Sequence, residues 1–185
     1  MLQAKANSPI PESLNLKQKI NMTNEFVLEA INREFPESVL SSSEPYGMLT
    51  LEIKKEDLKK VVHHLRDSSL EINFLTDITG IHYPENKEKE LGVIYHLHNM
   101  KDNFRIRLKS FTQREGAEFE TLTDLYAGAN WMERETFDFF GIKFKGHPDL
   151  RVILNSPDLG YHPMLKEYRL EDGTRTDKDD KMFGR

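Results

Sequence analysis

The spacing of apolar side chains predicts two helices in the first third of the chain. Residues 24–35 have apolar side chains at helical spacing, and Pro36 ends the pattern. Residues 54–67 repeat this spacing on one face. That face consists of Leu58, Val61, Val62 and Leu65. Both stretches are therefore expected to pack one side against a core.

Alternating apolar and polar positions predict strands further along the chain. Residues 39–40 and 48–53 are two short extended runs joined by serine-rich turn residues. Residues 91–98 and 104–111 form a second pair around a tight turn, which predicts a hairpin. Residues 70–83 have apolar positions too irregular to assign to either class.

The order of these elements predicts an α+β fold. A third helical stretch spans residues 122–140, with a break near Gly128. We expect a core domain over residues 23–154, in which helices pack on a mostly antiparallel or mixed sheet. Residues 1–22 show little periodicity and are interpreted as a mobile N-terminal arm.

Residues 155–185 are predicted to form an extended C-terminal tail that binds a partner. Their large apolar side chains recur at neither helical nor strand spacing. Such a segment cannot bury enough surface to offset ~1–2 kcal/mol of backbone entropy per ordered residue. We therefore expect the tail to be mobile in the free chain and ordered only against another protein.

Composition narrows the classes of function. The 185 residues suit one compact domain with a tail. The formal net charge of −5 argues against nucleic acid as the main partner, because binding to phosphates requires an excess of Lys and Arg. The absence of cysteine excludes disulfides and any iron–sulfur cluster held by this chain's own thiolates. No apolar run suits a signal peptide or a membrane span, so membrane association is expected only through partners.

Two histidines suggest an alternative, a small hydrolase or metalloenzyme. His96 and His98 are two positions apart on a predicted strand, so both imidazoles project from one face and could ligate a metal. No third ligand follows at a recognisable spacing, and nucleophile and phosphate-loop motifs are absent. We therefore expect no catalytic, cofactor-binding or metal-ligating residue, and a colourless protein that binds neither NADH nor FMN.

Residues 130–141 are the most unusual stretch of the sequence. On a helix, their large apolar side chains would surround nearly the whole cylinder, which is typical of a buried helix. These side chains are Trp131, Met132, Phe137, Phe139 and Phe140. The same stretch contains four charged residues, Glu133, Arg134, Glu135 and Asp138, and Arg134 and Asp138 are one helical turn apart.

Two interpretations account for these charges. They could form a network inside their own domain, or one side of the helix could face a second protein whose Arg or Lys side chains pair with Glu133 or Glu135. We favour the second interpretation, because so small a domain can hardly cover a full ring of aromatic side chains. A buried carboxylate without a partner would also cost several kcal/mol.

The same stretch resembles the signature of a known family. Glu133-Arg134-Glu135, Asp138-Phe139-Phe140, His147, Arg151 and Ile153-Leu154 have the spacing seen in the thirty-kilodalton subunit of respiratory complex I, which is the C subunit of bacterial NADH–quinone oxidoreductase. Weaker matches at 74–77, 93–97 and 161–168 extend the resemblance over roughly residues 71–168. Three positions depart from the family pattern: His82 where Asp is common, Tyr161 where Gly is common, and Leu165 where Arg is common.

The resemblance implies a function through membership in a complex. The family subunit is structural and cofactor-free, while FMN and the iron–sulfur clusters belong to partner subunits of the complex that transfers electrons from NADH to quinone. It lies in the peripheral arm on the cytoplasmic side of the bacterial cell membrane, beside the terminal-cluster subunit and the quinone-cavity subunit. The residues expected at the subunit interface are Trp131, Glu133, Arg134, Glu135, Asp138, Phe139, Phe140, Gly141, His147, Pro148, Leu150, Arg151, His162, Pro163 and Lys166.

A related assembly is the alternative within the same family. Membrane-bound nickel–iron hydrogenases and formate hydrogenlyase-type complexes use a homologous subunit, which is often fused to their large subunit. No such extension follows Arg185 in the sequence, so we expect the complex I member.

Overall fold

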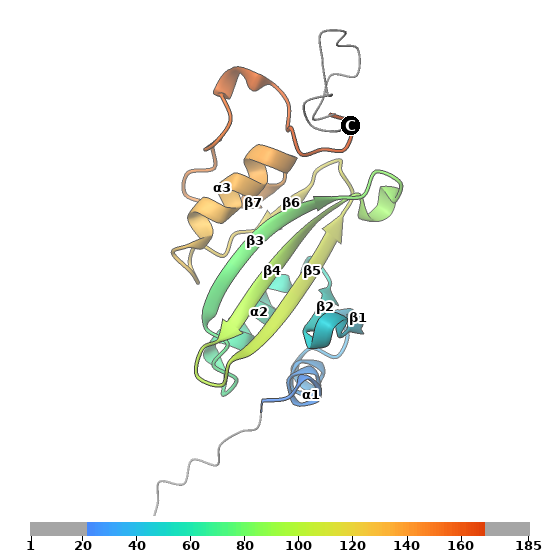
Figure 1. Ribbon diagram of the computed structural model, residues 1–185, viewed down its shortest axis with the longest axis vertical. Helices are drawn as coiled ribbons and strands as arrows, with labels where there is room; N and C mark the ends of the chain where they lie inside the picture. The colour runs from blue at the N-terminus through green and yellow to red at the C-terminus, as the bar shows by residue number, and fades with distance from the viewer. Residues whose placement is uncertain (1–21, 169–185) are drawn as a thin grey trace, which may run out of the picture.

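The computed structural model describes residues 22–168 (Figure 1). Its helices are α1 (Asn24–Glu34), α2 (Leu58–Asp67) and α3 (Ala129–Phe140). Its strands are β1 (Val39–Ser43), β2 (Leu49–Ile53), β3 (Phe74–His82), β4 (Leu91–Asn99), β5 (Phe104–Thr112), β6 (Glu118–Glu120) and β7 (Lys143–Lys145). Thr23 begins α1 as an N-cap whose hydroxyl accepts the Phe26 N–H. The predicted first two helices and the β4–β5 hairpin are confirmed.

Five strands form one mixed sheet in the order β1-β2-β5-β4-β3. β2 and β5 are parallel, with Leu49 opposite Ile106, and the other neighbouring pairs are antiparallel. The α+β class and the mixed sheet are therefore confirmed. β6 and β7 form a separate parallel pair, which lies against α3.

The stretch that the sequence left unassigned contains β3, one of the two edge strands of the sheet. Its register with β4 shifts between Leu75 and Asp77. A bulge of this kind inserts an extra residue, so the alternation of apolar and polar positions is interrupted. This interruption explains the irregular periodicity of residues 70–83.

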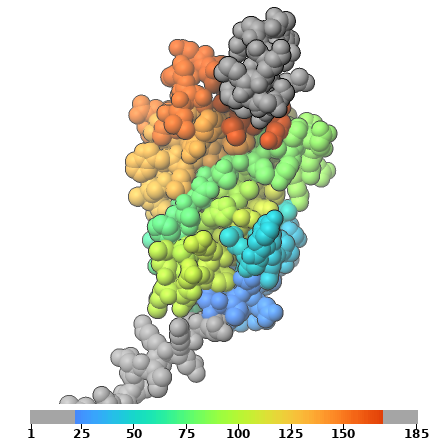
Figure 2. All heavy atoms as spheres, viewed as in Figure 1, coloured from blue at the N-terminus to red at the C-terminus, as the bar shows by residue number. Residues whose placement is uncertain are grey.

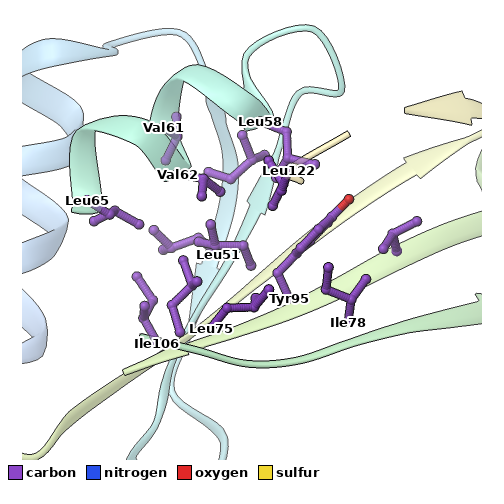
Figure 3. Packing of buried hydrophobic residues seen from close by; sticks show 14 of the residues in the cluster. Leu51, Leu58, Val61, Val62, Leu65, Leu75, Ile78, Tyr95, Ile106 and Leu122 are labelled. Atoms are coloured by element: carbon purple, nitrogen blue, oxygen red, sulfur yellow. The ribbon is translucent and has the colours of Figure 1, made fainter. Parts of the chain in front are cut away.

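The main core lies between α2 and the inner face of the sheet (Figure 3). The α2 face predicted from the sequence points toward Leu51, Ile106 and Tyr95, and all of these side chains are buried. Figure 1 shows α2 behind the sheet and α3 beside β3. The opposite face of β3, β4 and β5 is left without a covering helix in this view.

The third helix is shorter than predicted. α3 begins at Ala129, so the predicted break near Gly128 is confirmed. The part of the predicted helix before this break is wrong, because residues 122–128 form turns. Leu122 and Tyr126 are buried because they pack into the core from this turn, and their spacing imitates a helix. α3 packs closely on β3, where a Cβ on Gly80 would overlap the Phe140 ring.

The chain after residue 154 packs on its own domain as far as the structure describes it. The Met164 N–H donates to the Phe139 carbonyl (3.1 Å), and Leu165 is buried in the core. The prediction that this tail is ordered only on a partner is therefore wrong for residues 155–168. The remainder of the tail and residues 1–21 of the predicted arm lie outside the described residues, while Met22 packs against the core.

Candidate functional site

Helix α3 places Glu133 inside the domain, with both carboxylate oxygens bonded to the segment after β6. The Thr121 hydroxyl donates to Oε2 and the Leu122 N–H donates to Oε1, each over 2.6 Å. Glu133 is fully buried and forms no ion pair with any residue between 22 and 168. The interpretation that a partner's cation pairs with Glu133 is therefore wrong, because neutral donors of its own domain satisfy it.

Burial raises the pKa of Glu133 to about 7, and the bonds from Thr121 and Leu122 only partly oppose this effect. The carboxyl therefore titrates near neutral pH. Burial likewise raises the pKa of Tyr95 well above its usual range, and the charge of Glu133 adds to this effect. The Tyr95 hydroxyl has no hydrogen-bond partner among the described residues.

Asp138 binds the chain that follows β7. Its Oδ2 accepts the backbone N–H groups of Ile153 (3.0 Å), Leu154 (2.8 Å) and Asn155 (3.0 Å). Its Oδ1 accepts the side-chain amide of Asn155 (3.0 Å). Burial alone would raise the pKa of Asp138, but the bonds from Asn155, Leu154 and Ile153 outweigh it and lower the pKa to about 2. Asp138 is therefore an ionised anchor for this segment.

Arg134 binds the same segment one turn earlier. Its Nε donates to the Arg151 carbonyl and its Nη2 donates to the Val152 carbonyl, each over 3.1 Å. Although Arg134 and Asp138 are one helical turn apart, they do not pair with each other in the described structure. They act on one peptide segment through opposite groups, Arg134 on its carbonyls and Asp138 on its N–H groups.

Residues 147–168, which we call the C-terminal strap, follow α3 along its length. His147 Nε2 donates to the Asn130 carbonyl at the start of the helix (3.1 Å). At its end, His162 Nδ1 donates to the Asp138 carbonyl (2.9 Å). Gly141 ends α3 with a φ of +75°, and a Cβ there would approach the His162 ring to 2.6 Å. Glycine therefore allows both the turn and the contact with the strap.

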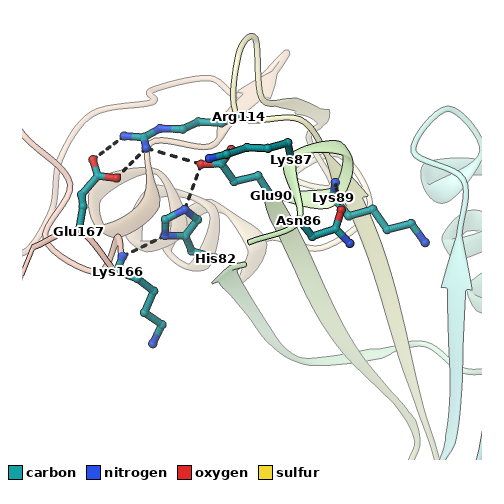
Figure 4. Close-up of polar contacts among 8 residues, drawn as sticks. All are labelled: His82, Asn86, Lys87, Lys89, Glu90, Arg114, Lys166 and Glu167. Carbon is teal, nitrogen blue, oxygen red and sulfur yellow. Dashed lines mark hydrogen bonds and ion pairs between the residues drawn. The ribbon is translucent and has the colours of Figure 1, made fainter. Parts of the chain in front are cut away.

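A second set of polar contacts holds the end of the strap against the sheet (Figure 4). The buried His82 accepts the Lys166 N–H at Nδ1 (2.9 Å), and its Nε2 contacts Oε1 of buried Glu90 (3.2 Å). Arg114 binds Glu167 with two hydrogen bonds of 2.7 and 2.6 Å and lies 3.6 Å from Glu90. The bond to Glu167 raises the pKa of Arg114.

Sequence reasoning missed these contacts. Arg114 and Glu167 are far apart in sequence and show no local spacing, and the only signal was the unusual residue His82 at a position where the family commonly has Asp. The bond from the Lys166 backbone gives that histidine a function in this chain, because an imidazole can accept one N–H while its other nitrogen donates to Glu90.

The other predicted interface residues divide into packed and exposed groups. Phe139 and Phe140 are half-buried, and Leu150 packs against the core. Glu135 and Pro148 are exposed, Pro163 is half-buried, and the Arg151 side chain is exposed beside Asp149 (2.9 Å). The structure therefore places the whole predicted set on α3 and the strap, and assembly through these residues stays a prediction.

Large apolar side chains remain exposed on α3 and the strap. Trp131 is 59% exposed and Leu154 is 65% exposed, although both belong to a segment otherwise held by internal bonds. The other members are Ile153, Tyr161, Met164 and Tyr168. We call these six residues the apolar surface of the strap. Large apolar side chains that stay exposed on one part of a domain are typical of surfaces that bind another protein.

The two histidines considered as metal ligands have other partners. His96 Nε2 accepts the Arg107 Nε–H (2.8 Å), and His98 Nε2 contacts Asn103 (3.1 Å). Because a guanidinium occupies the lone pair of His96, this nitrogen is not available to a cation. Within residues 22–168, no group of three or more potential ligands is arranged to hold a metal ion. No helix in the same range is long and apolar enough to span a bilayer.

These contacts define an α+β domain whose third helix is bound to a strap that presents an apolar surface. The family model described as "Respiratory-chain NADH dehydrogenase, 30 Kd subunit" matches residues 51–174, and the chain belongs to this family. A relative from Geobacter metallireducens, the C subunit of its NADH-quinone oxidoreductase, is 36% identical over 149 residues, covering 80% of this chain and 91% of the relative.

Two solved structures have a similar fold. A trypsin-resistant fragment of Nqo5 (residues 1–134) is 31% identical with a TM-score of 0.57, covering 67% of this chain and 99% of the fragment. A chain of the membrane-bound sulfane sulfur reductase, an archaeal respiratory membrane complex, has a TM-score of 0.66 at 23% identity, covering 79% and 85% of the two chains. The second likeness shows the fold alone.

One relative removes the distinction that we based on chain length. The C/D subunit of the NADH-quinone oxidoreductase of Bdellovibrio bacteriovorus is 42% identical over 118 residues, which are 64% of this chain but only 20% of that longer chain. A subunit of NADH-quinone oxidoreductase can therefore also be a much longer chain than this one. The presence or absence of an extension does not separate complex I from the related hydrogenase assemblies.

Proposed function

We propose that this chain is a cofactor-free structural subunit of a proton-translocating NADH–quinone oxidoreductase. In this proposal FMN and the iron–sulfur clusters belong to partner subunits, and the chain lies in the peripheral arm on the cytoplasmic side of the membrane. The absence of cysteine supports the proposal, because the chain has no thiolate to ligate a cluster. The names of its relatives support the choice of this complex over a hydrogenase.

One observation supports a structural role. Around α3 the charged side chains are bonded within the domain, whereas large apolar side chains are exposed. Glu133, Arg134 and Asp138 are satisfied by their own domain, so they are not reserved for chemistry or for a ligand. Trp131 and Leu154 are exposed on the same rigid scaffold. We therefore assign the apolar surface of the strap to docking against other subunits of the peripheral arm, the terminal-cluster and quinone-cavity subunits first among them.

The test compares assembly with folding. Trp131→Ala together with Leu154→Ser is expected to reduce co-purification of the other subunits at least tenfold and to lower NADH–quinone activity in parallel. The melting temperature of the free chain should change by only a few degrees, because both side chains are already exposed. Leu40→Ser is the matched control, since Leu40 is 52% exposed on the distant edge strand β1. Full assembly with the double variant would overturn the proposal.

Absorption spectroscopy tests the cofactor-free part of the proposal separately. The purified chain is expected to show no visible band and to retain no flavin through gel filtration. A stoichiometric flavin or a visible band would contradict this part and leave the docking experiment unaffected.

A further inference from the structure

Three cations form a row on the outer face of β5. Arg105, Arg107 and Lys109 alternate with Ile106 and Leu108, which are buried on the inner face. Successive members of this row are about 7 Å apart, because a strand rises ~3.4 Å per residue. None of the three forms an ion pair with a carboxylate in the described part of the chain. An unpaired basic row is unexpected in a chain whose formal net charge is −5.

The row lies on an open surface. In Figure 2 the green and yellow-green atoms of the central strands form the visible face between the blue N-terminal elements and the orange α3. α2 packs on the other face, where the core lies (Figures 1 and 3). Arg105 is exposed, and Arg107 and Lys109 are half-buried, so another molecule can reach part of each side chain. They are also separate from the apolar surface of the strap.

His96 fixes the central cation. Arg107 is always protonated, so its Nε–H must donate to His96 Nε2, and this bond requires the neutral imidazole with its proton on Nδ1. Nδ1 lies 3.6 Å from Oδ2 of Asp77 on β3, which orients the ring. With Nε engaged, the two terminal nitrogens of Arg107 bond to no acceptor among the described residues. Their geometry suits a carboxylate that approaches end-on.

We propose that the outer face of β5 binds an extended acidic segment of another protein in the same assembly. Carboxylates at alternate positions of an extended chain have the spacing of Arg105, Arg107 and Lys109. The segment would run along β5 and pair its side chains with this row. The inference rests on the proposed function, since it assigns a second partner surface to a docking subunit.

Other anionic partners fit less well. Recognition of an anionic membrane requires a cluster of about four to eight Lys or Arg side chains, more than this row provides. The overall negative charge disfavours nucleic acid. Residues 169–185 of this chain contain equal numbers of acidic and basic residues, so they offer the row no net opposite charge. They do place Asp177 and Asp179 at alternate positions, so the experiment must distinguish this segment from another protein.

Photo-cross-linking in the purified complex identifies the occupant. A photoreactive phenylalanine at Ile94 replaces an apolar residue directly opposite Lys109 and leaves all three cations in place. We expect a cross-link to another subunit, in a segment with at least two Asp or Glu residues at alternate positions. Met100, exposed in the β4–β5 turn, is the matched position at which this product should be absent. A cross-link to lipid, to residues 169–185 or to a segment without carboxylates would overturn the proposal, and so would no cross-link.

Charge reversal tests the contribution of the row. Arg107→Glu with Lys109→Glu should reduce retention of the cross-linked subunit at least tenfold, and this loss should be reversed by Lys substitutions at the carboxylates that the cross-link identifies. Lys143→Glu, an exposed change on β7, is the control and should leave retention unchanged. If reversal has no effect while the Trp131 and Leu154 variant still abolishes assembly, this inference fails and the proposed function stands. If the chain co-purifies with no subunit at all, both fail.

Discussion

Glu133 and Asp138 lie on the same helix, and their surroundings shift their pKa values in opposite directions. Glu133 accepts two hydrogen bonds and has a pKa of about 7, whereas Asp138 accepts four and has a pKa of about 2. Both side chains are buried. For Glu133 the effect of burial outweighs its two donors, whereas for Asp138 the donors from residues 153–155 outweigh the effect of burial.

Glu133 makes the stability of the domain depend on pH near neutrality. Its pKa in the folded chain is above the ordinary value of 4.5, so the folded state holds the proton more tightly than the unfolded state. Its contribution to stability is fully present below pH 4.5 and is lost as the pH rises through 7. Relative to Glu133→Gln, the native chain should lose about 3 kcal/mol of unfolding free energy between pH 4.5 and 8.

Urea unfolding of both proteins at several pH values measures this difference. Glutamine keeps the size of the side chain and cannot ionise, so any pH-dependent difference between the two proteins reports on the Glu133 carboxyl. A difference that stays constant from pH 4.5 to 8 would show that Glu133 does not titrate in this range.

At the scale of elements, one helix organises the polypeptide on both sides of it. α3 accepts bonds from the segment before it through Glu133 and binds the strap after it through Arg134 and Asp138. The charged residues of α3 therefore connect three segments, namely the turn before the helix, the helix itself and the strap. Its polar residues stabilise the position of the helix, and its exposed apolar residues are left for partners.

Residues 153–155 of the strap should detach from α3 when Asp138 is truncated. Asp138→Ala removes four hydrogen bonds, with an expected cost of about 2–3 kcal/mol because the donors of the strap lose their acceptor. Hydrogen exchange should become fast at the amides of Ile153, Leu154 and Asn155, while the amides of β4 stay protected. Arg151→Ala is a suitable control, since its side chain pairs only with exposed Asp149. Unchanged exchange at the strap amides would contradict the anchoring role.

The sequence was sufficient to predict elements whose pattern is local. The periodicity of Leu58 to Leu65 located α2, and the spacing of residues 133–154 led to the family. It was not sufficient where local structure depends on contacts with residues far away in the sequence. The bulge in β3 concealed a strand, the packing of Leu122 and Tyr126 imitated helical turns, and the donors to Glu133 come from a turn that has no motif. For the same reason the sequence did not show that Thr121 and Leu122 of this chain, rather than a cation of another protein, bind Glu133.

At the scale of the whole molecule, the end of the strap is fixed to the sheet by two contacts with different physical properties. The contact with His82 is buried, whereas Arg114 and Glu167 are 42% and 40% exposed at their side chains. Water screens the exposed pair and replaces its bonds at little cost. The buried contact is therefore expected to contribute most of the stabilisation at this end of the strap.

Two substitutions test this ranking. His82→Ala should lower the unfolding free energy by about 2–3 kcal/mol, because it leaves the Lys166 N–H without its acceptor and removes the buried one of the partners of Glu90. Arg114→Met should cost less than about 1 kcal/mol. Urea unfolding gives both values. Equal losses for the two variants, or a larger loss for Arg114→Met, would show that the exposed pair dominates.

The parallel pairing of β2 with β5 has a consequence for the order of folding during synthesis. Leu49 leaves the ribosome long before its partner Ile106, and α2, β3 and β4 are made in between. The β1–β2 hairpin therefore lacks its neighbouring strand until β5 emerges, and its apolar face must meanwhile be covered by α1 and α2 or stay in water. Closing so long a loop is entropically costly, so this pairing is expected to be a late and slow event. In a nascent chain that ends before β5, Leu49, Leu51 and Ile53 are open to chaperones unless α1 and α2 already cover them.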